Sequence, residues 1–399
     1  MKILISSQSY KDYQNYIRSK CYAIELVKSG HQVTIITTSP TRSLFYKTEN
    51  INGIRVVVSP EILGNRFRMY SWGMIDTIFR TIYILLSKYD IYHFDGNHPA
   101  IILPFFVKRL FSSAKFVNEW MDWCIDVKSG FSIADKIANF YEKMTHTKIR
   151  KYFDGVVVIS QFLYNETLRL GIDRSRILYL PSGCDIDKIY PCDKINVKRK
   201  YGLDVNRISL GIIGYESGDW EEFCYVYDAL RILENKYNFN NFDFIVSGKH
   251  DPMTKKQQNK HQYNYKYVGW ADNYNEFLST LDIAILPLKD TKKNRAKYPN
   301  KLSDFMAAGL PIVSNPVGEV KSLHSKIKFG LLDEQYNSEN LAEILYQLIR
   351  NSQLREKFGN NGRIFAETEF SWEEQSKKLL EFYHKIQGSN RNQDNHPLN

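Results

Sequence analysis

The chain has 399 residues, which leaves room for two domains with well-filled cores. Hydrophobic residues make up 43% of the chain and charged residues 25%, which is ordinary for a soluble globular protein. The five cysteines are scattered and form no Cys-x-x-Cys pair, so they predict reduced thiols in a cytoplasmic protein rather than a disulfide framework or a zinc site.

No stretch of the sequence predicts a targeting segment or a membrane span. The apolar run at the N-terminus, MKILISS, is too short for a signal peptide. Arg80 interrupts the apolar residues 78–86, and Lys108 and Arg109 end the run 101–107, so neither reaches the ~20 residues that cross a bilayer. We therefore do not expect an integral membrane protein.

The net charge of +10 is concentrated in one half of the chain. Residues 1–200 hold 29 Lys and Arg against 18 Asp and Glu, and the remaining residues hold 25 against 26. Such asymmetry predicts an anionic partner, and without a nucleic-acid-binding motif we favour a membrane surface over nucleic acid. Biased surface composition is the alternative. The cations that we expect at the membrane are Arg66, Arg68, Lys108, Arg109 and those of residues 143–151.

The first half of the chain reads as alternating strands and helices. Lys2–Ser6 predicts a strand, a helix follows to Lys28, and the turn Gly30-His31 leads into the β-branched strand Val33–Thr38. This order is a βαβ unit, which predicts a parallel sheet. Further strands are expected at Ile54–Val58, Asp90–Phe94, Lys115–Asn118, Gly155–Ile159 and Arg176–Leu180.

Two of these strands end in polar loops, where open α/β sheets place their ligands. The first loop is Asp95–His98, and the second is the acid- and tryptophan-rich stretch Asn118–Trp123. Aromatic faces suit apolar sugar faces and carboxylates suit hydroxyls, so the second loop predicts a sugar-binding wall. A packed aromatic corner with solvated acids is the alternative.

The second half repeats the alternation after a charged, proline-containing segment. It opens at Ile208–Gly214, with further strands expected at Phe242–Ser247, Tyr265–Val268, Asp282–Leu286 and Pro311–Ser314. We predict a first domain at residues 1–188, a linker at 189–206 and a second domain at 207–370. A capped amphipathic helix is expected at 371–387 and a disordered tail at 388–399.

The stretch Lys292–Val320 carries the clearest functional signal. It opens with four cations, and from Asn300 the spacing of Leu302, Phe305 and Met306 predicts a helix with one buried face. Lys301 and Asp304 lie on another face of this helix, beside its N-terminus, which favours phosphate. A lysine for phosphate and an aspartate for a ribose diol predict a nucleotide-sugar site. The alternative is a solvated helix with an i,i+3 ion pair.

The run PNKLSDFMAAGLPIV resembles the donor-site signature of glycosyltransferase family 4, the group 1 glycosyltransferases, in which a helix of the form Glu-Ala-Met-Ala-x-Gly-x-Pro-Val follows the donor loop. The resemblance extends in order from Lys2 to Ile386. It implies that Asp304 binds the ribose, that Lys301 meets the diphosphate, and that Gly214, Tyr215, Lys249 and Tyr298 belong to the donor site. It also implies that Asp122 faces the acceptor and acts in catalysis together with Lys301.

Three departures from the family pattern weaken parts of this assignment. Ala296 stands where the family has its first glutamate, and the first loop, Tyr10–Tyr16, has no glycine. Tyr215-Glu216 follows Gly214 where members commonly carry an arginine and a lysine for the pyrophosphate, so Lys249 and the cations of residues 292–301 remain as its partners.

The resemblance implies a GT-B fold, with two Rossmann-like α/β domains of parallel sheets facing a central cleft and a C-terminal helix that crosses back to the first domain. It implies a retaining hexosyltransferase, without a metal or cofactor, that moves sugar from a nucleoside-diphosphate sugar to a glycan or lipid-linked acceptor in polysaccharide biosynthesis. We expect it in the cytoplasm or on the inner face of the cell membrane. Alternatives are a sugar-nucleotide-binding homologue without turnover and another GT-B activity such as an epimerase.

Overall fold

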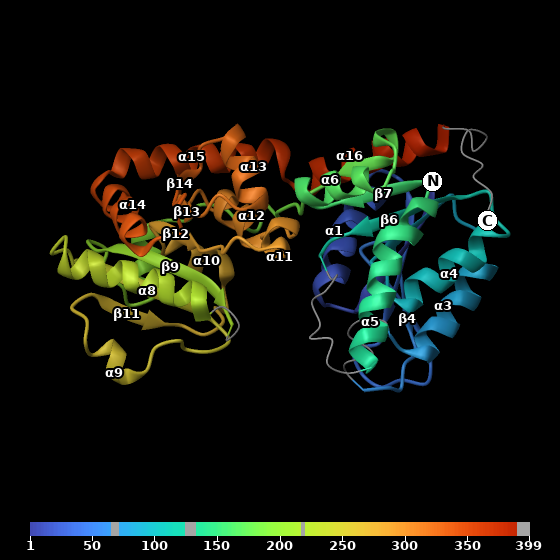
Figure 1. Ribbon diagram of the computed structural model, residues 1–399, viewed down its shortest axis with the longest axis horizontal. Helices are drawn as coiled ribbons and strands as arrows, with labels where there is room; N and C mark the ends of the chain where they lie inside the picture. Colours follow the sequence, from blue (N-terminus) through green and yellow to red (C-terminus); the bar gives the residue numbers. More distant parts are fainter. Residues whose placement is uncertain (65–71, 124–132, 217–219, 389–399) are drawn as a thin grey trace. The chain divides into compact units, whose positions relative to one another are not determined.

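The computed structural model describes residues 1–64, 72–123, 133–216 and 220–388. The chain divides into two compact units, here called unit 1 (Met1–Pro181 with Trp372–Asn399) and unit 2 (Ser182–Ser371). Each unit is an α/β structure built on its own sheet (Figure 1).

Unit 1 contains an eight-stranded sheet in the order β3-β4-β2-β1-β5-β6-β7-β8. All neighbouring strands are parallel except β3 and β4, which form an antiparallel pair. The strands are β1 (Lys2–Tyr10), β2 (Gln32–Thr38), β3 (Lys47–Ile51), β4 (Ile54–Ser59), β5 (Ile91–Asp95), β6 (Lys115–Trp120), β7 (Gly155–Val158) and β8 (Ile177–Tyr179). The predicted parallel strands are thus confirmed, and β3 is a strand that the sequence analysis missed.

Helices cover both faces of this sheet because successive strand residues point to opposite sides. Ile3 and Ile5 pack with the helices α1 (Gln14–Lys28) and α16 (Trp372–Gly388), whereas Leu4 packs with α3 (Met74–Leu86) and α4 (Pro99–Arg109). The other helices in the described part of unit 1 are α5 (Ile133–Met144), a π-helix (Thr145–Ile149), two 3₁₀ turns (Arg150–Tyr152 and Arg174–Arg176) and α6 (Gln161–Arg169).

Helix α16 confirms the predicted return of the chain to the first domain. Its residues Leu379 and Phe382 are buried in the same core as α1, and the Trp372 ring lies edge-on to Tyr22 at 5.3 Å. The Tyr383 hydroxyl lies 2.6 Å from Nδ1 of His93 on β5, so the helix is also joined to the sheet by a buried hydrogen bond. The tail that we predicted to be disordered lies, beyond Gly388, outside the described residues.

Unit 2 contains a parallel six-stranded sheet in the order β11-β10-β9-β12-β13-β14. Its strands are β9 (Ile208–Tyr215), β10 (Phe242–Gly248), β11 (Asn264–Tyr267), β12 (Ile283–Leu286), β13 (Ile312–Ser314) and β14 (Gly330–Leu332). Its helices are α7 (Lys194–Lys200), α8 (Trp220–Asn235), α9 (Lys255–Gln258), α10 (Tyr274–Ser279), α11 (Lys292–Ala296), α12 (Asn300–Ala307), α13 (Gly318–Lys326), α14 (Ser338–Arg350) and α15 (Ser352–Glu369).

The segment 189–206, which we predicted to be a linker, carries α7 and lies within unit 2. Lys198 of this helix donates to Asp282 at 2.6 Å and Lys194 does so at 2.8 Å, just before β12. Burial alone would raise the pKa of Asp282, but these two lysines hold it below its usual value. The charges that made the segment look like a linker therefore attach it to the sheet.

The structure also shows which of the cations that we expected at a membrane are exposed. Lys108 and Arg150 are buried, and Arg66 and Arg68 lie outside the described residues. In the segment 143–151, the exposed cations are Lys143, Lys148 and Lys151. Among the residues that the structure describes, no helix has both the length and the apolar character to span a bilayer.

Candidate functional site

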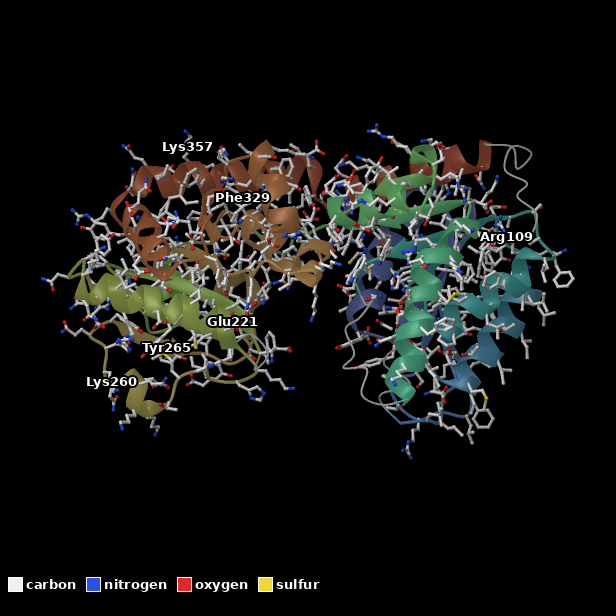
Figure 2. The ribbon with its side chains drawn as sticks, viewed as in Figure 1. Arg109, Glu221, Lys260, Tyr265, Phe329 and Lys357 are labelled. Atoms are coloured by element: carbon white, nitrogen blue, oxygen red, sulfur yellow. The ribbon has the colours of Figure 1, made fainter. Side chains whose placement is uncertain are left out.

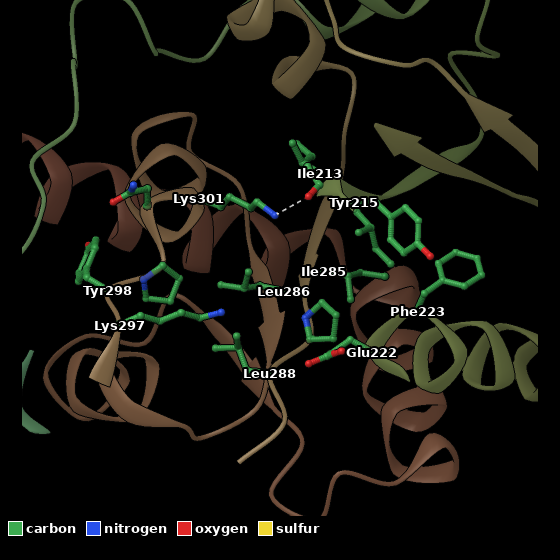
Figure 3. A pocket seen from close by; sticks show the side chains of 15 residues that line it. Ile213, Tyr215, Glu222, Phe223, Ile285, Leu286, Leu288, Lys297, Tyr298 and Lys301 are labelled. Atoms are coloured by element: carbon green, nitrogen blue, oxygen red, sulfur yellow. Dashed lines mark hydrogen bonds between the residues drawn. The ribbon is translucent and has the colours of Figure 1, made fainter. Parts of the chain in front are cut away.

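A cavity of about 290 Å³ opens at the carboxyl end of the unit 2 sheet (Figure 3). This is the edge where open parallel sheets bind their ligands. Its walls come from the ends of β9 and β12, the first turn of α12 and the first turns of α8. The lining residues are Ile212–Tyr215, Glu222, Phe223, Ile285–Leu288 and Lys297–Lys301.

Helix α12 brings Lys301 to the end of β9. The helix begins at Asn300 and buries Leu302 and Phe305 in the unit, which confirms the predicted helix. Lys301 lies on another face, and its Nζ donates a 3.1 Å hydrogen bond to the carbonyl oxygen of Gly214, drawn as a dashed line in Figure 3. An ammonium group has three N–H donors and a full positive charge, so it suits phosphate oxygens in this cavity.

The backbone conformation at position 214 favours glycine, and a side chain there would also displace the flexible end of Lys301. The φ of Gly214, +68°, lies in the left-handed region, which residues with a side chain rarely adopt. A Cβ added there would lie 2.8 Å from Cε of Lys301. The glycine therefore allows the chain to turn out of β9 while the lysine side chain passes over it.

Asp304 lies one helical turn after Lys301 and is held by a residue that the sequence analysis did not single out. The Tyr274 hydroxyl donates to Oδ2 of Asp304 at 3.1 Å, from the start of α10. Burial raises the pKa of Asp304 to about 6, although the Tyr274 hydrogen bond and Lys301 act in the opposite direction. This carboxyl group therefore changes its charge near neutral pH.

If Asp304 binds the ribose, Asp304→Asn weakens binding of a nucleoside and of its diphosphate alike, by about tenfold, because it removes hydrogen bonds to a charged acceptor. The parent protein also loses nucleoside affinity as the pH falls through about 6, since the carboxylate then becomes protonated. Calorimetry at pH 7.5 and pH 5 measures both effects. Equal affinities of parent and variant at pH 7.5 contradict the ribose assignment.

Tyr298 and Tyr215 reach the cavity mainly as structural residues. The Tyr298 side chain is buried, with its hydroxyl 2.5 Å from the Ser303 hydroxyl and its ring stacked on Phe370. Tyr215 is buried at the end of β9 with its ring edge-on to Phe223. Both tyrosines fix the walls of the cavity, and the Tyr298 hydroxyl is directed at the protein rather than at a ligand.

Lys249 lies at the end of the neighbouring strand, β10. Its backbone N–H donates to the Tyr215 carbonyl oxygen at 2.9 Å, and its side chain is exposed and absent from the cavity lining. The preceding Gly248 is needed for this close strand approach, because a Cβ there would lie 2.2 Å from the Tyr215 carbonyl oxygen. The structure thus brings Lys301, Gly214, Tyr215 and Tyr298 to one cavity, with Lys249 beside it.

The cavity is also lined by two charged residues that the sequence analysis did not assign individually to the site. Lys297 lines it from the loop before α12, and Glu222 lines it from the first turn of α8. Ala296, at the position of the family's first glutamate, is completely buried, so it offers the cavity no polar group. Among the described lining residues Glu222 is the one carboxylate, and its place in the first turn of α8 is set by the fold.

In unit 1, Asp122 follows the end of β6 and is exposed. Its carbonyl oxygen accepts a 2.8 Å hydrogen bond from Nε1 of Trp120, whose ring stacks with Trp123 at 6.0 Å. The loop is therefore an ordered aromatic corner that presents an exposed acid. The aromatic packing matches the aromatic corner expected as the alternative, and a role of this loop in sugar binding stays a prediction.

A buried polar network lies behind this loop, at the ends of β5 and β6. Arg18 of α1 donates to Glu119 at 2.9 Å, and His93 lies 3.3 Å from the other oxygen of Glu119. Burial alone would raise the pKa of Glu119, but Arg18 and His93 hold it at about 2. Burial and then the charge of Glu119 raise the pKa of the paired residue Asp95 to about 8.

A second polar cluster follows β5 directly and joins it to the end of α5. Asn97 donates to Glu142 at 2.7 Å, and His146 and His98 lie 3.2 Å and 3.5 Å from the oxygens of the same carboxylate. Burial lowers the pKa of His146 to about 4, so it is neutral at physiological pH. The sequence analysis singled out the loop 95–98 but not its partners, which lie more than 40 residues away in the chain.

The two halves of the chain each match a known domain family. Residues 22–188 match the model described as Glycosyltransferase Family 4, and residues 208–351 match the model described as Glycosyl transferases group 1. A protein named as an uncharacterised glycosyltransferase of Methanocaldococcus jannaschii is 23% identical over 289 residues, which cover 70% of this chain and 71% of that protein.

Solved structures share the whole architecture. Sucrose-phosphate synthase from Thermosynechococcus elongatus superposes with a TM-score of 0.74 at 14% identity, covering 97% of this chain and 99% of that one. HepE of Anabaena, solved in complex with UDP and glucose, gives 0.66 at 15% identity and covers 96% of this chain and 98% of its own. These likenesses establish the GT-B fold. With its two matching domains, the chain belongs to the group 1, or family 4, glycosyltransferases.

Proposed function

We propose that the protein is a retaining hexosyltransferase that moves a sugar from a nucleoside-diphosphate sugar to a glycan or lipid-linked acceptor, in the biosynthesis of a cell-surface polysaccharide or glycoconjugate. The observation that carries this proposal is the position of Lys301, whose Nζ lies at the end of β9 in a cavity lined by a second lysine. The Anabaena neighbour, which was solved with UDP and glucose, makes a UDP-sugar the first donor to test.

The cavity suits the departure of a diphosphate. As the bond from the sugar C1 to the diphosphate oxygen breaks, negative charge grows on that oxygen, and the bond from the acceptor hydroxyl to C1 forms. Lys301 and Lys297 supply positive charge at the cavity wall, and the N-terminus of α12 adds its dipole. The three groups would stabilise the leaving group more strongly in the transition state than in the substrate.

Asp122 is proposed to receive the proton or orient the hydroxyl of the acceptor. If so, Asp122→Asn cuts the rate of transfer by about 100-fold, the lower range for general base catalysis, while donor affinity stays unchanged. The side chain is exposed, so the substitution leaves the fold intact. Single-turnover transfer and calorimetry with the nucleoside diphosphate measure the two quantities. Loss of donor affinity, or of thermal stability, shows a structural role instead.

Incubation with a panel of radiolabelled sugar nucleotides tests the reaction class. Transfer to an acceptor, or slow hydrolysis of one donor, is expected of a transferase. Binding of a sugar nucleotide without any turnover would indicate that this protein is a binding homologue without activity. Ala296 and the absence of cations directly after Gly214 are the sequence features that favour this alternative. Formation of an epimeric sugar would indicate the remaining alternative, another GT-B activity such as that of an epimerase.

We also propose peripheral contact of unit 1 with an anionic membrane. The excess positive charge of residues 1–200 supports it, and each exposed cation near an anionic leaflet adds about 1 kcal/mol. The cations available for this contact include Lys143, Lys148 and Lys151, which are exposed along α5 and the turns after it. Such a contact would keep a lipid-linked acceptor close to the enzyme.

A further inference from the structure

Helix α3 of unit 1 has its polar residues inside and its apolar residues outside. A helix on a sheet normally buries an apolar stripe and exposes charges. In α3 the buried positions are Asp76, Thr77, Arg80 and Ile84, so all but one of them are polar. The fold therefore buries Arg80, the charged residue within this apolar run, and exposes apolar residues on either side of it.

The inward side chains of α3 form a fully buried ion pair. Nε of Arg80 donates to Asp76 at 2.6 Å, and both side chains are completely inaccessible. Arg80 also donates to the Ser7 carbonyl oxygen at 2.6 Å and to the Thr38 hydroxyl at 2.8 Å, at the ends of β1 and β2. Asp76 accepts further hydrogen bonds from Thr38 and Ser59. The charges are thus used within the unit and leave the outer face of the helix without them.

The outward side chains of α3 form an apolar stripe. They recur at helical spacing, and Ile82 is 54% exposed and Leu86 77% exposed. The exposed members of the stripe are Met74, Ile78, Ile82, Leu85 and Leu86. We call this set, with the α4 residues named next, the α3–α4 face.

Helix α4 continues the face beside the end of α3. Nζ of Lys108 donates to the carbonyl oxygens of Leu85 at 3.0 Å and Ser87 at 2.5 Å, which joins the C-terminal ends of the two helices. The outward residues of α4 and the turn after it are again apolar, and Phe111 is 74% exposed. They are Leu103, Phe106, Leu110 and Phe111.

The charged residues at the border of this face are mainly cationic. Lys88 is exposed directly after α3, and Arg109, labelled in Figure 2, ends α4 and forms a 3.2 Å ion pair with the part-buried Asp154. The Tyr152 ring lies 6.4 Å from Phe106, and Nζ of Lys151 lies 5.3 Å from that ring, which adds a third cation. Within residues 74–88 and 99–115 the only acid is Asp76, which is buried on Arg80.

We propose that the α3–α4 face is a membrane-docking surface that inserts its apolar side chains into the interface of an anionic lipid bilayer. Apolar residues that lie between cations match the two layers of such an interface, the acyl boundary and the phosphate headgroups. A second copy would bring the same cations, such as the exposed Lys88, and not the negative charge that complements them. The proposal deepens the peripheral contact proposed above, because it adds hydrophobic insertion on a named surface to charge attraction.

Flotation of the full chain with vesicles tests the proposal. The parent binds vesicles of 30% phosphatidylglycerol in phosphatidylcholine more strongly than vesicles of phosphatidylcholine alone, and retains part of its binding in 1 M salt, where charge attraction is screened. The triple variant Ile78→Gln, Ile82→Gln, Leu86→Gln loses at least about tenfold in partition coefficient at low salt, because three exposed aliphatic side chains no longer bury apolar area. All three side chains are exposed, so the variant folds as the parent does.

The matched control is Ile364→Gln, which changes an isoleucine of unit 2 that is 59% exposed. This control variant is expected to bind vesicles as the parent does. Equal flotation of the parent and the triple variant overturns the proposal. So does a parent that is dimeric in analytical ultracentrifugation while the triple variant is monomeric, because the face then belongs to a second copy. Nucleoside-diphosphate binding is measured on the same samples, so failure of the membrane proposal and failure of the donor site are distinguished.

Discussion

Lys301→Ala is expected to weaken nucleoside-diphosphate binding by at least about thirtyfold, because removing one partner of a desolvated charge pair costs about 2–5 kcal/mol. The cavity holds Lys297 as its other cation, and no arginine or lysine follows Gly214, so Lys301 carries much of the charge that faces the diphosphate. The rate of transfer should fall further than the affinity, since charge on the leaving oxygen grows in the transition state. Calorimetry and single-turnover transfer measure the two effects.

The control for this prediction is Lys321→Ala, which removes an exposed lysine on α13 outside the cavity lining and leaves the affinity unchanged. The bare nucleoside supplies a second control, because Lys301→Ala should reduce its binding much less than that of the diphosphate. If folded Lys301→Ala binds every nucleoside diphosphate as well as the parent does, the donor site lies elsewhere.

Arg80→Met is expected to destabilise the protein by about 3–5 kcal/mol, because it leaves Asp76 as an uncompensated buried charge. Both members of this pair are completely inaccessible, and Arg80 also donates to the strand ends at Ser7 and Thr38. The first urea-induced unfolding transition, followed by circular dichroism, should move to clearly lower urea concentration. The double variant Asp76→Asn, Arg80→Met should recover part of the loss, since no charge then remains buried.

The comparison for Arg80→Met is Arg295→Met, which breaks an ion pair of similarly short distance between Arg295 and Asp290. Both side chains of that pair are about half exposed, so solvent screens the interaction and the unfolding curve should scarcely change. A curve for Arg80→Met that matches the parent would show that the pair contributes little and that α3 is held by other contacts.

The parts of the fold that follow from local patterns could be predicted from the sequence. Helix α12 was predicted because three apolar residues at helical spacing identify its buried face, and in the structure it ends just before Gly309, which adopts a φ of +67°. The parallel strands were predicted because β-branched runs alternate with helical stretches. The edge strands β3 and β14 were missed, since they are short and their partners are set by tertiary contacts.

The candidate site was predicted only as far as its residues lie close together in the chain. Lys301 and Asp304 share one helix, but Tyr274, which bonds to Asp304, is 30 residues away. Tyr298 illustrates the opposite difficulty. It directly precedes the signature run, yet its hydroxyl is bonded to Ser303 inside the protein, and no sequence pattern states which way a side chain points.

The inversion of α3 could not be predicted for a similar reason. Periodicity reports that apolar and polar residues occupy different faces of a helix, but it does not report which face meets the sheet. In α3 the strand ends at Ser7, Thr38 and Ser59 supply enough hydrogen-bond partners to bury a charged pair. The same partners decide that the apolar stripe faces outward.

The position of a bound nucleotide tests the assignment of the donor site most directly. A crystal structure of the protein with the nucleoside diphosphate that binds most tightly in calorimetry should show the diphosphate at the end of β9, within hydrogen-bond distance of Nζ of Lys301. The ribose hydroxyls should meet the Asp304 carboxylate at a pH above about 6, the pKa of that group. A nucleotide bound elsewhere, with Lys301 still bonded only to protein groups, would contradict the assignment.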